Sequence, residues 1–226
     1  MRLLLAFIAI VAVSNSRLST SDASVINYGN LIGSNVFFNG ISENPSFNPT
    51  PTTGLYGTPT VSGDMLVFAP LSFEANTTGQ PSVNSILSAS LVAKPGFFIT
   101  GVRFEEFGDY AIALPFGGSG SVSASLNATV GIANNSDIFV ASSNTIPGIV
   151  NGTFNNPSFP INFAPTHSVS LSATNTLTAQ TQGLITDAFI KKKGFKLTVS
   201  TVIPEPTSAL IFLGLGLAGL SSRRRR

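Results

Sequence analysis

The sequence predicts an all-β protein, a single antiparallel β-sandwich of the Ig-like or jelly-roll type. Several segments alternate apolar and polar residues, which is the two-residue period of a strand with one buried face. Clusters of Gly, Pro, Asn and Asp separate these segments. The central part of the chain shows no apolar run with helical period over about ten residues. Strands at this spacing are typical of a sandwich, and the pattern does not choose between the two topologies.

The clearest predicted strand spans Val122 to Ile132. Its apolar residues occupy every second position, and Ser, Asn and Thr occupy the positions between them. The same alternation predicts further strands, and short apolar runs add candidates. These segments are 65–68, 71–73, 86–92, 98–104, 169–173 and 195–199.

Turn residues fall between the predicted strands. Gly and Asn tolerate the backbone angles that tight turns require, and Pro fixes its own φ. The predicted turns are 94–96, 115–120, 134–137, 147–148 and 155–157.

The first residues have the features of a secretory signal peptide. Met1 and Arg2 precede an apolar run from Leu3 to Val13, which is too short for an ordinary membrane span. We therefore predict a signal peptide over residues 1–23, with cleavage between Ser14 and Ala23, and a sandwich domain over residues 24–203.

The C-terminal end combines three features. Pro204, Glu205 and Pro206 form an extended strip, because each proline disfavours helix in the residue before it. An uncharged, glycine-containing segment follows, for which we predict a membrane helix over about residues 207–222; it is short for a hydrocarbon layer of about 30 Å. The cluster Arg223, Arg224, Arg225 and Arg226 closes the chain and, by the positive-inside rule, stays cytoplasmic.

This order of features resembles the PEP-CTERM sorting signal of Gram-negative bacteria that make extracellular polysaccharide. The resemblance covers residues 204–226. It implies recognition of Pro204, Glu205 and Pro206 by an exosortase, transient residence in the inner membrane, and transfer to the cell surface or the matrix. The segments 96–100 and 104–110 also resemble a stretch of uncharacterised PEP-CTERM proteins, which implies no activity.

Charge and composition exclude several function classes. The sequence pI of about 9.2 suggests a nucleic-acid partner, but residues 24–203 hold six Lys and Arg against eight Asp and Glu. The basic residues therefore belong to the two ends, and we expect no nucleic-acid binding. The chain has no Cys and one His, His167, which argues against thiolate chemistry, zinc and a catalytic triad. We expect no cofactor.

The acidic segment Phe104–Tyr110 and the lysines after it are the candidate sites of the central part. Glu105, Glu106 and Asp109 offer oxygen ligands to Ca²⁺ around a turn at Gly108; the alternative is carboxylates facing water near a bulge, with the aromatic side chains packed inward. Lys191, Lys192, Lys193 and Lys196 form either a patch for an acidic polysaccharide or the guard of an edge strand.

The leading hypothesis is a non-enzymatic, exported protein with a structural or adhesive role in the exopolysaccharide matrix, and with the secretion machinery and an exosortase as its processing partners. The alternative is a carbohydrate-binding module that stacks sugars on exposed aromatic rings. Its candidate residues are Tyr28, Phe47, Tyr56, Tyr110 and Phe159. A glycan hydrolase that uses Glu105, Glu106 or Asp109 is the least favoured hypothesis, because paired acids need a cleft.

Overall fold

The computed structural model describes residues 24–46, 54–144, 148–183 and 186–204, and these residues form twelve strands in two antiparallel sheets. Sheet A has the order β1-β2-β6-β11-β8-β9, and sheet B has the order β10-β7-β12-β4-β3, with β5 also paired to β12. The predicted all-β, antiparallel sandwich is confirmed. The strands are β1 Ile26–Ile32, β2 Val36–Pro45, β3 Thr60–Ser62, β4 Met65–Phe68, β5 Glu74–Asn76, β6 Ser82–Ala93, β7 Phe98–Leu114, β8 Ser119–Val130, β9 Ala133–Ser143, β10 Gly148–Thr166, β11 Ser168–Gln182 and β12 Asp187–Val202.

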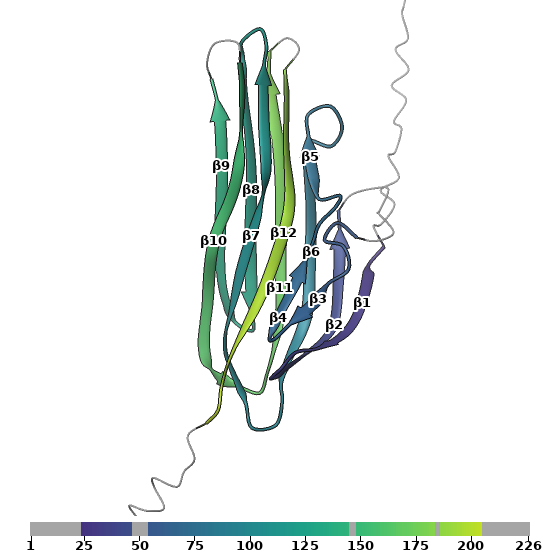
Figure 1. Ribbon diagram of the computed structural model, residues 1–226, viewed down its shortest axis with the longest axis vertical. Coiled ribbons are helices and arrows are strands. Elements are labelled where there is room, and N and C mark those ends of the chain that lie inside the picture. Colours follow the sequence, from purple (N-terminus) through teal and green to yellow (C-terminus); the bar gives the residue numbers. More distant parts are fainter. Residues whose placement is uncertain (1–23, 47–53, 145–147, 184–185, 205–226) are drawn as a thin grey trace, which may run out of the picture.

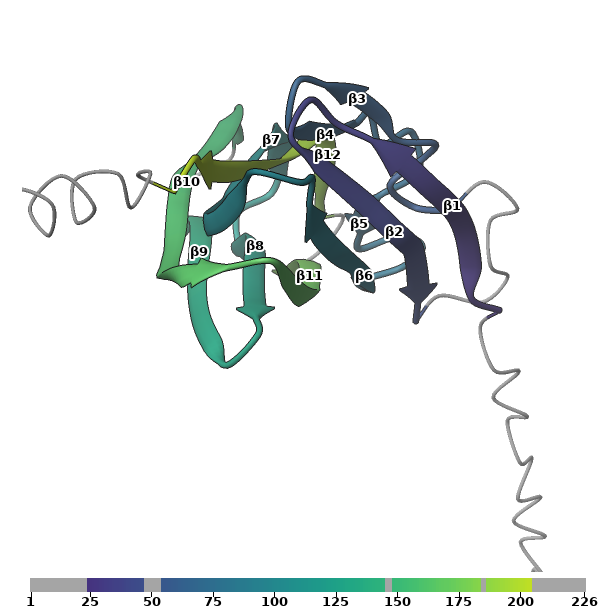
Figure 2. The same ribbon diagram turned by 90° about the horizontal axis from the view of Figure 1, so that it is seen from below.

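The two sheets lie face to face and share one core. Figure 1 shows the long strands of both sheets running along the longest axis, and Figure 2 shows the two layers from below, with edge strands β9 and β10 side by side. The inward residues of every second position fill the space between the layers. The largest buried aromatic side chains are Tyr56, Phe38, Phe68, Phe73, Phe104, Phe154 and Phe195.

The alternation of residues 122–130 is confirmed in β8. Val122, Leu126 and the other apolar residues of this strand are buried, and the Ser and Thr residues between them face outward. The prediction was wrong for Ile132, which is fully exposed because the chain turns at Gly131 with a positive φ of 62°. A positive φ is the conformation that glycine adopts most easily.

Three other local predictions were wrong. Residues 134–137 do not form a turn but belong to β9, and residues 155–157 lie inside β10. Strand β10 tolerates its prolines because it is the edge strand of sheet B and has a bulge between Asn156 and Phe159. Residues 71–73 are not a strand; the neighbouring strand is β5, at Glu74–Asn76.

The predicted end segments lie outside the described residues. They are the signal peptide 1–23, the helix 207–222, Glu205, Pro206 and the arginines 223–226. Pro204 is described and follows the end of β12 by two residues. None of the residues that the structure describes forms a helix long and apolar enough to cross a membrane. The predicted domain boundaries stay a prediction.

Candidate functional surfaces and a buried polar network

The predicted acidic site is divided between the two faces of β7. Glu106 points into the core and is fully buried, whereas Glu105 and Asp109 lie on the outer face of sheet B. Gly108 is not at a turn but in the middle of the strand, where the ring of Phe154 packs against it. Phe107 is 41% exposed, so the expectation that it packs inward was wrong.

The lysines lie on β12, which is an inner strand of sheet B between β7 and β4. The edge-strand interpretation was therefore wrong. Lys191, Lys193 and Lys196 face outward and pair with Glu74, Asp109 and Glu105, respectively.

Three ion pairs give each outward lysine on the outer face of sheet B a negatively charged partner. Each outward lysine of the cluster already has a carboxylate partner, so the cluster is not an unpaired basic patch for a polyanion. Glu105 and Asp109 point away from Glu106, and the described residues contain no group of three or more His, Asp or Glu that could hold a metal ion. The three predicted calcium ligands therefore do not form a common set.

The fourth lysine, Lys192, points into the core and is the centre of a buried polar network. Its Nζ contacts the carboxylate of Glu106 on β7 and the amide oxygen of Asn175 on β11, so it connects the two sheets. Asn156 on β10 donates to the other carboxylate oxygen of Glu106 over 2.8 Å. The Nδ2 of Asn175 donates to the hydroxyl of Tyr56 over 2.7 Å.

Aromatic rings enclose the ammonium group of Lys192. The Nζ lies 5.1 Å from the ring centroid of Phe73, 5.5 Å from that of Phe195 and 6.0 Å from that of Tyr56. These distances are within the range of cation–π attraction. Burial lowers the pKa of Lys192, while the attraction of Glu106 acts in the opposite direction. Burial also raises the pKa of Tyr56 well above its usual value, so its hydroxyl stays neutral.

A second buried carboxylate, Glu43 on β2, fixes the loop that carries Tyr56. It accepts hydrogen bonds from the hydroxyl of Tyr28 over 2.5 Å, the backbone N–H of Leu55 over 2.8 Å and the hydroxyl of Ser85 over 2.8 Å. The N–H of Tyr56 donates to it over 3.3 Å. Burial, together with Glu43, raises the pKa of Tyr28. The loop after residue 53 is therefore tied to sheet A from inside the core.

The outer face of sheet A is different in chemistry from that of sheet B. Strands β6, β11 and β8 are neighbours, and none of them contains Asp, Glu, Lys or Arg. Apart from Ile86 and Val92 on β6, their outward positions carry hydroxyl and amide side chains, which we call the hydroxyl face. Its members are Asn84, Ser88, Ser90, Ser121, Ser123, Ser125, Asn127, Thr129, Ser172, Thr174, Thr176, Thr178 and Gln180.

The strand register aligns these side chains in rows across the sheet. Thr176 is opposite Asn84 on one neighbouring strand and Ser125 on the other. The hydroxyls of Ser123 and Thr178 are 2.5 Å apart, and Asn84 Nδ2 donates to Thr176 Oγ1 over 3.3 Å. Neighbouring strands are about 4.8 Å apart, so most of the face is a regular array of short polar groups, interrupted by Ile86.

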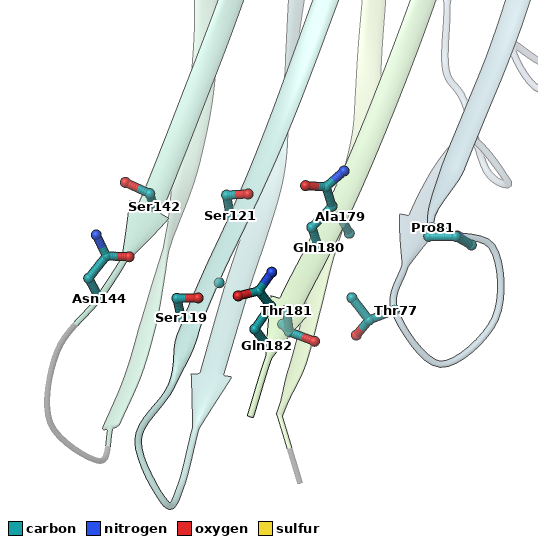
Figure 3. A pocket seen from close by; sticks show the side chains of 11 residues that line it. Thr77, Pro81, Ser119, Ser121, Ser142, Asn144, Ala179, Gln180, Thr181 and Gln182 are labelled. Atoms are coloured by element: carbon teal, nitrogen blue, oxygen red, sulfur yellow. The ribbon is translucent and has the colours of Figure 1, made fainter. Parts of the chain in front are cut away.

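One end of the hydroxyl face is hollowed into a groove of about 530 Å³ (Figure 3). Figure 3 shows side chains from β8, β9 and β11 around it, with Thr77 and Pro81 on the far side. The groove has no charged residue. Its lining residues are Thr77, Pro81, Ser119, Gly120, Ser121, Ser142, Asn144, Ala179, Gln180, Thr181 and Gln182.

The three proposed sugar platforms whose side chains the structure describes do not form an exposed strip. Tyr56 is buried in the core, Tyr28 is half-buried against Phe68 and Glu43, and Tyr110 packs on Phe139. Phe47 and the side chain of Phe159 lie outside the described part of the chain. His167 is exposed between β10 and β11, and its ring lies 4.1 Å from that of Phe98.

The groove and the exit of the chain are at opposite ends of the sandwich. Ser119, Asn144 and Gln182 lie near the Asp187 end of β12, because Asp187 is paired with Ala113 at the end of β7 that leads into β8. Pro204 follows the other end of the same strand. The molecule is thus a β-sandwich body with its polar groove far from the point at which the C-terminal tail begins.

Residues 202–226 match a known sequence family, the PEP-CTERM protein-sorting motif. The chain therefore carries a PEP-CTERM sorting signal, which confirms the resemblance found in the sequence. The motif indicates export, processing by an exosortase and sorting to the cell surface.

Comparisons of the whole chain give weak likenesses. No curated protein matches it. The carbohydrate-binding module TmCBM61, solved with beta-1,4-galactotriose, is 13% identical, with 80% of this chain and 90% of that chain covered and a TM-score of 0.25. A GH31 alpha-xylosidase from Xanthomonas citri is 9% identical, with 77% and 32% covered and a TM-score of 0.13. At these TM-scores neither protein's ligand or activity carries over to this chain.

Proposed function

We propose that this protein is a non-enzymatic component of the cell surface or extracellular matrix of a Gram-negative bacterium, and that its hydroxyl face adheres to a neutral exopolysaccharide. In this proposal the signal peptide directs export, the C-terminal helix holds the protein briefly in the inner membrane, and an exosortase then releases it from Arg223–Arg226. The sorting motif at residues 202–226 supports the delivery part of the proposal.

The observation that carries the adhesive part is the uncharged, hydroxyl-rich outer face of β6, β11 and β8. Ser and Thr hydroxyls both donate and accept hydrogen bonds, as sugar hydroxyls do. Short side chains on a rigid sheet lose little conformational entropy on binding, and β-branched Thr is already restricted at χ1. Many weak contacts along one polymer chain add up through effective concentration.

A neutral polymer fits this face better than an acidic one. The outward lysines of β12 are occupied by Glu74, Asp109 and Glu105 on the opposite side of the molecule. The hydroxyl face itself offers hydrogen bonds and no ionic attraction. A carbohydrate-binding module that stacks sugars on aromatic rings is the second candidate function. Tyr56 is buried in the core, so its ring is not exposed for stacking on a sugar.

The test compares one substitution on two faces. Thr176→Arg places a long cation at the centre of the hydroxyl face, and Thr198→Arg places the same side chain on the outer face of β12; both threonines are half-buried, outward positions inside a strand. Binding is measured by co-sedimentation with cellulose, with cross-linked dextran and with alginate as the acidic comparison. We expect Thr176→Arg to weaken binding to a neutral polymer at least about tenfold, or about 1.4 kcal/mol, with Thr198→Arg unchanged.

Equal losses in the two variants, or binding only to alginate with strong salt dependence, would refute the adhesive role of the hydroxyl face.

The proposed sorting by an exosortase is tested separately, through the mass of the released protein and through the Glu205→Ala variant. A released protein that still holds residues 207–226, or a Glu205→Ala variant that is processed normally, would contradict exosortase sorting without bearing on adhesion.

A further inference from the structure

Three side chains with complementary chemistry meet in the core at Lys192. Its primary amine contacts the side-chain amide of Asn175 on one side and the carboxyl of Glu106 on the other. All three residues are fully buried. They come from three strands, with Asn175 in sheet A and the other two in sheet B.

We propose that Lys192 and Asn175 join in a self-catalysed isopeptide bond, in which the amine of Lys192 displaces ammonia from the amide of Asn175 and Glu106 transfers the protons. The bond would connect β11 to β12 across the sandwich, between residues that are 17 positions apart in the chain.

The surroundings make Lys192 a nucleophile. An ammonium group has no lone pair to attack a carbonyl, so the lysine must first lose a proton. The rings of Phe73, Phe195 and Tyr56 exclude water around Nζ, and burial lowers the pKa of Lys192. Transfer of the proton to Glu106 replaces two buried charges by a neutral amine and a neutral acid, which removes the cost of holding two ions in an apolar core.

The amide is held with its carbonyl toward the amine. Asn175 Nδ2 donates to the hydroxyl of Tyr56 over 2.7 Å, so its Oδ1 faces Lys192. Asn156 binds one oxygen of Glu106 over 2.8 Å and leaves the other oxygen for Lys192. Asn156 is thus a positioning residue, whereas Glu106 contacts the reacting nitrogen. Holding reactants in one arrangement removes much of the entropic barrier to their reaction.

The reaction balances without any further reactant. The lone pair of Nζ forms a bond to Cγ of Asn175, and the carbonyl electrons move to Oδ1, where the protonated carboxyl of Glu106 stabilises them. Glu106 then passes a proton to Nδ2 and takes one from Nζ. The Cγ–Nδ2 bond breaks as the electron pair on Oδ1 re-forms the carbonyl, ammonia leaves, and the products are a secondary amide between the two strands and a protonated Glu106.

The test is the mass of the purified full chain under denaturing conditions, compared between wild type and Glu106→Gln produced in the same way so that any terminal processing cancels. We expect the wild type to have lost one ammonia, about 17 Da, and the variant to retain it, because an amide cannot shuttle the protons. Peptide mapping should find a branched peptide that joins Asn175 to Lys192. A wild-type chain that is folded and has its full unmodified mass would overturn the proposal.

Two further variants separate reaction from folding. Lys191→Met changes the neighbouring lysine, which faces outward and pairs with Glu74, so the ammonia loss should remain. Asn175→Asp offers a carboxyl instead of an amide, so the chain should lose one water, about 18 Da, in place of ammonia. If Lys192 and Glu106 form only a buried ion pair, none of these proteins should lose ammonia or water. Ammonia loss that persists in Lys192→Met would also refute the assignment.

Discussion

The hydrogen bonds of Glu43 should make this residue one of the most sensitive positions of the sandwich. Glu43→Ala removes the acceptor of the Leu55 and Tyr56 N–H groups and of the Ser85 hydroxyl, all of which are buried. Each buried donor without an acceptor costs about 1–3 kcal/mol. The long 3.3 Å contact from Tyr56 belongs at the low end of that range. We therefore expect a total loss of about 4–6 kcal/mol, against a usual stability of 5–15 kcal/mol.

Urea unfolding provides the measurement, followed by near-ultraviolet circular dichroism and tyrosine fluorescence, since the chain has no Trp. With a urea m-value of about 2–3 kcal/mol/M, the midpoint should fall by about 2 M. The matched control is Glu105→Ala, which removes an outward glutamate at 3.9 Å from Lys196 and should cost about 0–1 kcal/mol. Glu43→Gln keeps one acceptor oxygen and should lie between the two.

Equal midpoints for Glu43→Ala and Glu105→Ala would refute this account, because they would mean that the buried donors find other acceptors when the carboxylate is removed. A loss in Glu43→Gln as large as that in Glu43→Ala would show instead that the negative charge, and not the number of acceptors, holds the loop.

Two more predictions concern pH and close packing. Tyr28 and Tyr56 have raised pKa values in the folded protein, so the sandwich should keep its stability below the unfolded tyrosine pKa of about 10 and lose up to about 1.4 kcal/mol per pH unit per tyrosine above it. Tyrosinate absorbance should then rise together with unfolding. Tyr28→Phe should reduce the slope of unfolding free energy against pH. Full ionisation of all tyrosines in the folded state would contradict the prediction. Gly108→Ala places a methyl group against the backbone oxygen of Lys191 and 2.5 Å from the Phe154 ring, so thermal unfolding should show a loss of about 1–3 kcal/mol, and an unchanged Tm would speak against this packing.

The strand pattern was predictable because it is local. A single buried face imposes the two-residue period on every strand that contributes to the core, and Val122–Val130 carries that period without interruption. The turn after it was misplaced because Gly131 alone carries the change of direction, while the Asn-rich segment that follows continues as β9.

The buried network could be predicted only in part. The alternation through β7 places Glu106 on the same face as Phe104 and Ile112, whereas the general tendency of carboxylates to face water predicts the opposite face. Lys192 likewise occupies an inward position after Ile190 in β12. The choice of Asn175 as the partner depends on the packing of two sheets, which is a long-range relation that no local pattern contains.

The difference in charge between the two sheets could also be predicted only in part from the sequence. Strands β6, β8 and β11 contain no charged residue, and this is readable in the printed sequence. That they are neighbours in one sheet follows only from the topology, because β11 lies between two strands that precede it in the chain. The hydroxyl face is therefore a property of the strand order as much as of the composition.

The position of β12 has a mechanical consequence. This strand has 16 residues, is hydrogen-bonded to β7 along its length, and leads directly into the C-terminal tail at Val202. A pull on the C-terminal end of β12 against a polymer bound along the hydroxyl face would run parallel to the strand, so the hydrogen bonds to β7 would be strained in shear, all together, and would not open one after another from an end. The strand that leads into the sorting signal is thus also placed to transmit force along its length.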